Sequence, residues 1–459
     1  MKHHPSLAQF QEQLYSHLDN RANAVMALTN ALSGNTYARS VVELSLNPLF
    51  EGRHYSDLYK AINAFVLPEE VQWHLMAPFL PRPQKWPFWL LGVDVVPHPR
   101  PYAATLEDRG LVYRPQVITS NKPITIGHAY STVVLLTERL PGDPPWVVPL
   151  SVRRVASHQD RELVGAEQVQ SLLTDKHLPF HQDLCVEVGD SSYSKRAYLA
   201  THRALPNLVT ITRLRSNRVF YRAYAGDGAP RKGHPRWYGD RFALGEPETW
   251  HPPDEEATFS TETTRGRTYR VHIQAWRNML MRGTRDFPMQ RYPFTLVRIE
   301  VTTEDGIPLH RRPLWLLVMG VRREELSLRE IYEAYLRRPD QEHYHRFSKQ
   351  RLLATTYQTP DARREEQWWR LTQIVYFQLW LARPLTRSLP RPWERYLPHR
   401  KERPPSPSLV QRDFSRLIRQ LGTPARAAKP RGKSPGRARG TRLPPRKRHP
   451  VVRKTLQRA

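Results

Sequence analysis

Hydrophobic positions follow a helical period at the start of the chain and a strand-like pattern later. In residues 6–65 apolar side chains recur every three or four positions, at Leu7, Phe10, Leu14, Leu18 and again through Ala24–Leu32. Apolar residues at this spacing lie on one face of a helix. The pattern therefore predicts a small helical N-terminal domain over residues 1–80, which we expect to bind DNA.

Residues 81–217 contain apolar runs of strand length separated by two helical patterns. The runs follow the order β-β-β-α-β-α-β, at Trp86–Val96, Pro123–Leu136, Trp146–Val155, Glu162–Leu173, Leu184–Asp190, Ser194–Ala204 and Leu208–Leu214. Strands that alternate with helices in this way predict an α/β fold, with a mixed sheet and helices on its faces.

The pattern of hydrophobic and polar residues changes again at residues 218, 326 and 386. Residues 218–325 hold short β-rich runs punctuated by glycine and proline, which predicts a β-rich insertion. Ser327 is a helix cap, and helical spacing continues to residue 385, so residues 326–385 are predicted to complete the α/β core. Residues 386–459 form a basic, proline-rich tail that is expected to be largely disordered.

The net charge of the chain indicates the kind of partner that it binds. The 459 residues include 71 Lys and Arg against 43 Asp and Glu, a net charge of +28, which favours a polyanion. Residues 401–459 hold 18 basic and 2 acidic residues, a net of +16, together with nine prolines and four glycines. We expect disorder over 423–459, a short helix at Ser408–Leu421, and a tail that anchors non-specifically.

Several classes of protein are excluded by what the sequence lacks. A single cysteine, Cys185, excludes an internal disulfide, and its place in a predicted strand indicates an inert buried thiol. The apolar runs are far shorter than the roughly 20 residues of a membrane helix. No nucleotide-binding glycine loop is present. The 19 histidines show no zinc spacing: His128 is predicted at a strand end, and His343 and His345 are predicted to face solvent or DNA.

Two aspartates stand in or after predicted strands. Asp94 lies within an apolar run, where an ionised carboxylate is costly without compensation. Asp190 follows Gly189 at the end of the fourth strand, where functional groups collect in open sheets. The two acids would converge on a divalent metal, whereas Glu187 points to the opposite face. As an alternative, Asp94 is simply a turn residue that ends its strand.

A third acid lies in a helical pattern. Tyr335, Arg338, Glu342 and Lys349 follow one another at steps of three, four and seven positions, so they share one face of a helix. Pro339 fits the first turn of that helix. The alternative is an ordinary charged helix face, which is common in an arginine-rich chain.

These residues carry a resemblance to a known group of proteins. The Tyr335–Arg338–Glu342–Lys349 spacing resembles the Tyr-Arg-Glu-Lys signature of DDE-type transposases of bacterial insertion sequences, and the resemblance covers residues 6–385. Gly189–Tyr193 resembles the second acidic motif of this group, and the strand around Asp94 resembles the first. Ser191-Ser192 stands where the group often has Arg-Gly, and Pro339 stands where an aromatic residue is more usual.

The resemblance implies a ribonuclease H-like core in which Asp94, Asp190 and Glu342 are catalytic and hold two Mg²⁺ ions, for which Mn²⁺ substitutes. It implies phosphoryl transfer that cuts and joins DNA. Tyr335, Arg338 and Lys349 would contact DNA phosphates. Trp315 is a candidate to stack on a flipped base, with core packing as the alternative. Arg213 and Arg215, after the fifth strand, are either further DNA contacts or part of a solvated loop.

The expected partners are the double-stranded terminal inverted repeats of an insertion sequence and a target DNA, without a membrane. By the same resemblance the protein would act as a homodimer on paired ends, in the bacterial cytoplasm. Two alternatives remain open: a domesticated relative that binds DNA without cutting it, and a basic nucleic-acid-binding protein without catalytic activity.

Overall fold

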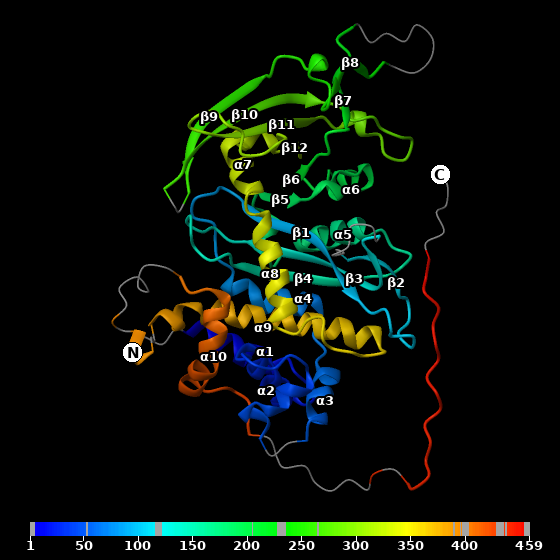
Figure 1. Ribbon diagram of the computed structural model, residues 1–459, viewed down its shortest axis with the longest axis vertical. Coiled ribbons are helices and arrows are strands. Elements are labelled where there is room, and N and C mark those ends of the chain that lie inside the picture. The colour runs from blue at the N-terminus through cyan, green and yellow to red at the C-terminus, as the bar shows by residue number, and fades with distance from the viewer. Residues whose placement is uncertain are drawn as a thin grey trace.

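A computed structural model describes residues 5–51, 54–114, 122–203, 205–226, 236–263, 266–388, 391–394, 396, 404–427, 436 and 438–453. The N-terminal residues form the predicted helices, which are α1 (Pro5–Ser16), α2 (Ala22–Ser33), α3 (Ser56–Ala64) and α4 (Glu69–Met76). They pack on α9 (Ala362–Ser388) and α10 (Pro407–Leu421). The helical part of the molecule is therefore built from both ends of the chain (Figure 1).

The centre of the molecule is a mixed sheet whose first six strands are β1 (Trp89–Pro99), β2 (Gly110–Tyr113), β3 (Ile124–Leu136), β4 (Val147–Val155), β5 (Cys185–Gly189) and β6 (Leu208–Arg213). Strand β3 runs antiparallel to β1, β2 and β4, whereas β1, β5 and β6 are parallel neighbours. The antiparallel strands β4, β3 and β1 beside the parallel strands β5 and β6 are the arrangement of a ribonuclease H-like core, which confirms the predicted fold class.

Two details of this sheet differ from the expected pattern. Strand β1 continues through Pro97 to Pro99, although the prolines were expected to end it at Val96. Beyond Gly92, β1 pairs with β3 on one side and no longer with β5 on the other. Proline is tolerated there because a strand without a neighbour on one side needs no N–H donor on that side. The short strand β2 was not predicted, because four residues carry too little pattern to be recognised.

Helices cover both faces of the core. On one face lie α5 (Arg161–Thr174) and α6 (Arg196–His202), where a Cβ added to Gly165 would meet the Val93 side chain at 2.9 Å. On the other face lies α8 (Arg338–Gln350), where a Cβ added to Gly92 would meet Gln341 Oε1 at 2.6 Å. Since alternate residues of a strand face opposite sides, Gly92 and Asp94 both face α8.

The β-rich insertion extends this sheet instead of standing apart from it. Four of its strands, β9 (Glu255–Glu262), β10 (Thr268–Met279), β11 (Phe294–Thr303) and β12 (Leu314–Met319), continue the sheet from β6, because β12 pairs antiparallel with β6. Strands β7 (Val219–Ala223) and β8 (Tyr238–Ala243) form a separate pair. Helix α7 (Leu328–Tyr335) follows, and Ser327 caps it through a complete capping box, as predicted.

The predicted tail contains the expected short helix and a second described segment. Helix α10 begins at Pro407, close to the predicted start, and buries Val410, Phe414, Leu417 and Ile418. Residues 438–453 form an extended segment along the side of the molecule (Figure 1), and the disorder expected over 423–459 stays a prediction. Residues 428–435, 437 and 454–459 of that stretch lie outside the described residues. Across the described residues we find no helix with the length and apolar character needed to span a membrane.

Candidate functional site

Asp94 and Asp190 lie side by side on the face of the sheet covered by α8. Strands β1 and β5 pair in parallel from Trp89↔Cys185 to Gly92↔Val188. Two further residues in the same register bring Asp94 beside Asp190, across a gap of roughly 4.8 Å between neighbouring strands. The register therefore places the two carboxylates near each other, and the charge of Asp190 acts on the Asp94 carboxyl.

The surroundings of Asp94 oppose its negative charge. Its side chain is 24% exposed. Burial raises the pKa of the Asp94 carboxyl to about 6, and the negative charges of Asp190 and Glu342 act in the same direction. The Arg338 guanidinium and the Val95 N–H, which donates to Asp94 Oδ1 at 2.8 Å, act in the opposite direction. A buried acid crowded by other acids is a site that favours a cation.

Asp190 is held by the turn that follows it. Its Oδ1 accepts hydrogen bonds from Ser192 N–H at 2.7 Å and from Ser192 Oγ at 2.6 Å, which caps the short 3₁₀ helix Ser191–Ser194. Gly189 lets the chain pass close to Tyr193, because an added Cβ would lie 3.0 Å from the Tyr193 side chain. Tyr193 itself is buried in the core. Ser192 of this motif therefore orients the carboxylate through its backbone N–H and its hydroxyl.

Glu187 points to the opposite face, as expected from strand alternation. It is fully buried, with Oε2 2.8 Å from His202 Nδ1, and Tyr198 donates to its Oε1. Both partners belong to α6. This acid is part of the core.

Helix α8 is fixed to the sheet by a buried ion pair near its start. Pro339 lies in its first turn, where a missing N–H costs nothing. Asp340, 2% exposed, accepts two hydrogen bonds of 2.9 Å from Arg139, which follows β3. This bidentate contact sets the position from which Glu342 and Lys349 project.

Glu342 is not gathered with the two aspartates. Its side chain is 52% exposed, and its Oε1 accepts from Arg338 Nη1 at 2.8 Å. Within the described ranges, the one group of three possible metal ligands whose atoms lie within 4.8 Å of one another is His74, Asp175 and His177, at the surface. The structure thus places Asp94 and Asp190 together and keeps Glu342 nearby in an ion pair.

His345 was predicted to face solvent or DNA, and this prediction is wrong. The residue is 7% exposed, its Nε2 lies 3.0 Å from Thr132 Oγ1, and its Nδ1 lies 3.8 Å from Asp94 Oδ2. Burial lowers the pKa of the imidazole to about 3, so the ring is neutral. His345 is three positions after Glu342, so the two residues lie near one another on the helix, and this spacing could have indicated that His345 lies close to the acids.

His128 is likewise more than a strand-end residue. It is buried, and its Nδ1 lies 2.7 Å from the Oε1 of Glu365 in α9. No local pattern indicated this contact, because the two residues are far apart in the sequence.

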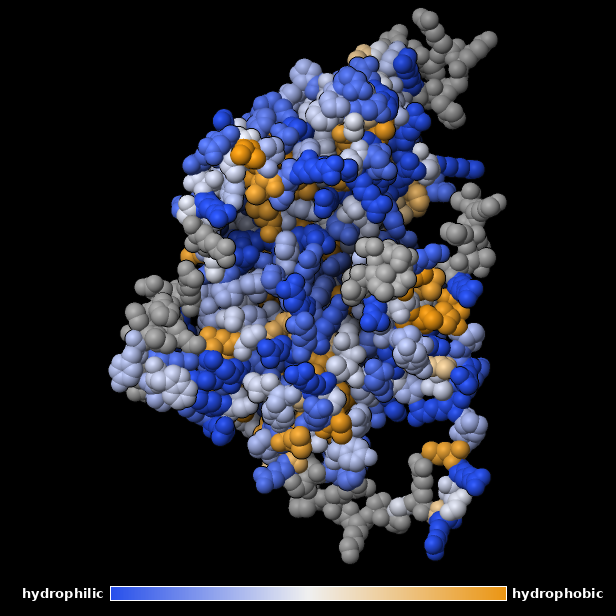
Figure 2. All heavy atoms as spheres, in the orientation of Figure 1, coloured by the Kyte–Doolittle hydropathy of each residue, from blue (hydrophilic) through white to orange (hydrophobic). Residues whose placement is uncertain are grey.

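Basic side chains surround the two aspartates. A cavity of about 730 Å³ is lined by Asp190 and by the predicted DNA contacts Tyr335, Arg338, Arg213 and Arg215. Burial raises the pKa of the Tyr335 phenol, while the charges of Arg338 and Arg213 act against it. Figure 2 shows mostly hydrophilic residues over α8 on this face.

Lys349 lies further along the same helix. Burial lowers the pKa of its ammonium group, and the charge of Asp94 acts in the opposite direction. All five predicted DNA contacts thus lie around the acids, and Arg215 Nε reaches Ser191 Oγ at 3.4 Å.

Trp315 is a core residue. It is 3% exposed and packs with Phe242, Trp250 and Trp276, with ring centroids 5.2 Å from Trp250. Trp250 is the less buried partner, and Arg298 stacks over its ring at 5.2 Å. The alternative of core packing therefore fits Trp315, and Trp250 is the more accessible ring of the cavity.

Comparison with known families identifies the chain. The family model described as DDE superfamily endonuclease matches residues 13–283, more than half of the sequence. The chain belongs to the DDE superfamily endonucleases. A search of curated proteins gives no match. Asp94 and Asp190 lie within the matched residues of this DDE endonuclease, and Glu342 lies beyond them.

Membership makes the protein a transposase-like nuclease that acts on DNA. Such endonucleases typically use divalent metal ions, and the donor chemistry fits. Asp94 and Asp190 offer hard oxygen ligands of the kind that divalent cations bind, and the charge of Asp190 acts on the Asp94 carboxyl.

Proposed function

We propose that this DDE endonuclease is a transposase that cleaves DNA at the ends of its insertion sequence and joins the freed strand to target DNA. The observation that carries the proposal is the pair Asp94 and Asp190, in register on adjacent parallel strands beneath a helix that carries Glu342. The basic cavity beside them, lined by Tyr335 and Arg338, supports a DNA end as the ligand.

Asp94, Asp190 and Glu342 are the proposed catalytic carboxylates and the ligands for two Mg²⁺ ions or for Mn²⁺ in their place. When bound, these ions activate the attacking oxygen and stabilise the leaving oxygen of an in-line phosphoryl transfer. The protein contributes the position of the carboxylates, through Ser192 at Asp190 and through the Arg139–Asp340 anchor of α8. The neutral His345 lies against Asp94 without adding a competing positive charge.

Arg338 has two roles in this proposal. Without DNA it forms the 2.8 Å ion pair with Glu342, and the charges of Asp94, Glu342 and Asp190 together raise the pKa of its guanidinium despite burial. A DNA phosphate in the cavity competes for the same guanidinium. Transfer of Arg338 to the phosphate releases Glu342 toward the two aspartates, so the third carboxylate joins the site when substrate is present.

The decisive experiment compares two variants that each lose one acid. Glu342→Gln should bind duplex DNA that carries the element ends with an affinity within twofold of the unmodified protein. It should lose cleavage in Mg²⁺ by about a thousandfold or more, because the proposed metal ions would lose one of their three carboxylate ligands. Glu333→Gln, on the outer face of α7, is the matched control and should cut normally. Normal cutting by Glu342→Gln would show that the assignment of the third carboxylate is wrong.

One observation favours a second function, a relative that binds DNA without cutting it. Glu342 is engaged with Arg338, and the three acids do not lie within metal-binding distance of one another in the described structure. In that case the unmodified protein would bind the ends in Mg²⁺ and in Mn²⁺ and release no product with either ion.

A further inference from the structure

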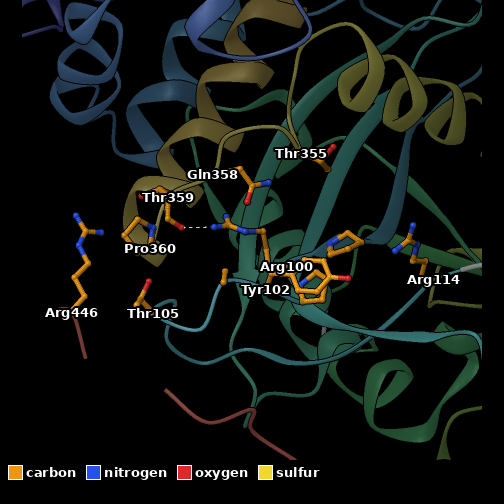
Figure 3. A pocket seen from close by; sticks show the side chains of 12 residues that line it. Arg100, Tyr102, Thr105, Arg114, Thr355, Gln358, Thr359, Pro360 and Arg446 are labelled. Atoms are coloured by element: carbon orange, nitrogen blue, oxygen red, sulfur yellow. Dashed lines mark hydrogen bonds between the residues drawn. The ribbon is translucent and has the colours of Figure 1, made fainter. Parts of the chain in front are cut away.

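A second hollow lies where β1 ends, away from the acid cavity. It has a volume of about 690 Å³ and lies between the loop after β1 and the loop that joins α8 to α9. Figure 3 shows its lining, with Arg100 and Tyr102 at the centre, Gln358 above them, and Arg114 and Arg446 on opposite sides. None of the 12 lining residues is acidic.

The floor of this hollow is rigid. The Arg100 guanidinium donates to the fully buried Glu365 at 2.5 Å and to the backbone oxygens of Tyr357 at 3.3 Å and Thr359 at 2.6 Å. His98 Nε2 lies 3.2 Å from the backbone oxygen of Thr355. The end of β1 is thereby tied to the α8–α9 loop, so the hollow exists before any ligand arrives.

The tail supplies one wall. His449 N–H donates to Ala104 O at 2.8 Å, and Val452 N–H donates to Arg109 O at 2.7 Å. Arg109 Nη2 donates in turn to His449 O at 3.3 Å. These contacts hold the segment 446–452 against the loop between β1 and β2, and they bring Arg446 to the rim of the hollow.

The lining has the chemistry of a nucleic-acid contact. Tyr102 is 97% exposed, so the face of its ring is open to a ligand. Arg114 and Arg446 are exposed on either side of it. Arginines that bind phosphates beside an aromatic ring that stacks on a base form the common pattern of sequence-tolerant DNA binding.

The distance from the acids is set by β1 itself. Asp94 and Arg100 are six residues apart on an extended chain, which spans about 20 Å at 3.3 Å per residue. A DNA duplex rises about 3.4 Å per base pair, so the same distance corresponds to roughly six base pairs.

We propose that this hollow is a second DNA-binding site, which holds the DNA about six base pairs from the phosphate at Asp94 and Asp190. Arg114 and Arg446 bind phosphates, Tyr102 stacks on a base, and the docked tail segment completes the site. The inference rests on the proposed function for the position of the reacting phosphate. It changes the role of the tail from a free anchor to a placed part of the DNA surface.

The first test measures DNA binding without divalent metal, so that no cutting occurs. Each lost phosphate contact should reduce the slope of log affinity against log salt by about 0.9. Arg446→Ala should show this reduction, and Val452→Pro, which removes the N–H donated to Arg109, should reproduce it. Arg442→Ala is the matched control, because this arginine lies in the same segment and does not line the hollow. Equal losses for Arg442→Ala and Arg446→Ala would show that the tail acts as a free anchor and would overturn the proposal.

The second test locates the DNA. Cys185 is fully buried, so an introduced cysteine is the accessible thiol for an iron chelate that cleaves nearby DNA. A chelate on Tyr102→Cys should cut in one narrow window, separated by about six base pairs or more from the window cut from Arg215→Cys in the acid cavity. Coincident windows, or cuts spread evenly along the DNA, would overturn the proposal. These readouts need no hydrolysis by the protein, so they remain informative if the proposed function fails.

Discussion

At the scale of single residues, Asp94 shows how one carboxylate is prepared for a cation. The sequence places it in an apolar strand, and the fold adds Asp190 and Glu342 near it. The result is an acid that binds its proton more tightly in the folded protein than in the unfolded chain.

The stability of the metal-free protein should therefore depend on Asp94 and on pH. Its pKa rises from an ordinary 3.8 to about 6 on folding. The stabilisation from the neutral carboxyl is present below about pH 4 and is lost as the pH rises through 6. Asp94→Asn, which stays neutral, should raise the free energy of unfolding by about 2 kcal/mol at pH 7.5 and by little at pH 4. Urea unfolding at both pH values measures this. Asp361→Asn, at an exposed position, is the control. An equal gain at both pH values would contradict the argument.

The affinity for a metal ion should rise as Asp94 ionises, whereas the stability of the metal-free protein should fall. A cation binds the ionised Asp94, so the affinity for Mn²⁺ should fall about tenfold per pH unit below pH 6. His345 does not contribute to this change, because its pKa of about 3 keeps it neutral over the range. Titration of Mn²⁺ between pH 5 and 7.5 measures the effect, and Asp94→Asn should abolish the pH dependence. A pH-independent affinity in the unmodified protein would count against Asp94 as a ligand.

At the scale of elements, α8 carries the helical residues of the site and is held by a specific anchor. Arg139 holds the buried Asp340 by two hydrogen bonds, and Gln341 packs over Gly92 in β1. This contact at the N-terminal end of α8 therefore fixes where Glu342 and His345 lie relative to the sheet. The position of the helix thus depends on a contact between residues that are about 200 positions apart.

Loss of the Arg139 anchor should cost more than loss of a surface ion pair. Arg139→Ala leaves Asp340 buried and uncompensated, so unfolding should become easier by about 3 kcal/mol. Arg329→Ala, which removes an exposed pair with Glu333 on α7, should cost less than about 0.5 kcal/mol. Urea unfolding of both variants at pH 7.5 tests the difference. Similar costs would show that the anchor is no stronger than a solvated contact.

At the scale of the whole molecule, the basic C-terminal part of the chain consists of two segments that lie in different places. Helix α10 belongs to the helical body, since Gln411 Nε2 donates to Leu32 O at 3.3 Å and Phe414 is fully buried. The segment 438–453 instead lies on the surface beside β2. The net charge by itself does not distinguish α10 from the segment 438–453.

Two truncations should separate the roles of these segments. A protein that ends at residue 426 keeps α10 and should unfold at nearly the same temperature as the full chain, while its DNA binding becomes less salt-dependent. A protein that ends at residue 400 loses four buried apolar side chains of α10 and should be unstable or insoluble. Thermal unfolding measures both. Equal stability would show that α10 does not belong to the core.

By itself the sequence determined the strands of the core and the capped helix after Ser327, and it singled out Asp94 and Asp190 as acids within or after a strand. These features depend on local periodicity, because a strand or a helix shows its buried face in residues that are close in the chain. The face shared by Tyr335, Arg338, Glu342 and Lys349 was predictable for the same reason.

Only the tertiary structure decided which partners cover those faces. It buried His345 against Asp94, paired Glu342 with Arg338, joined the insertion to β6 and placed α10 among the N-terminal helices. Each of these contacts joins groups whose environment is set by distant parts of the chain. Burial, charge and ion pairing depend on what lies opposite a side chain in space, and the local pattern of hydrophobic and polar residues does not contain that information.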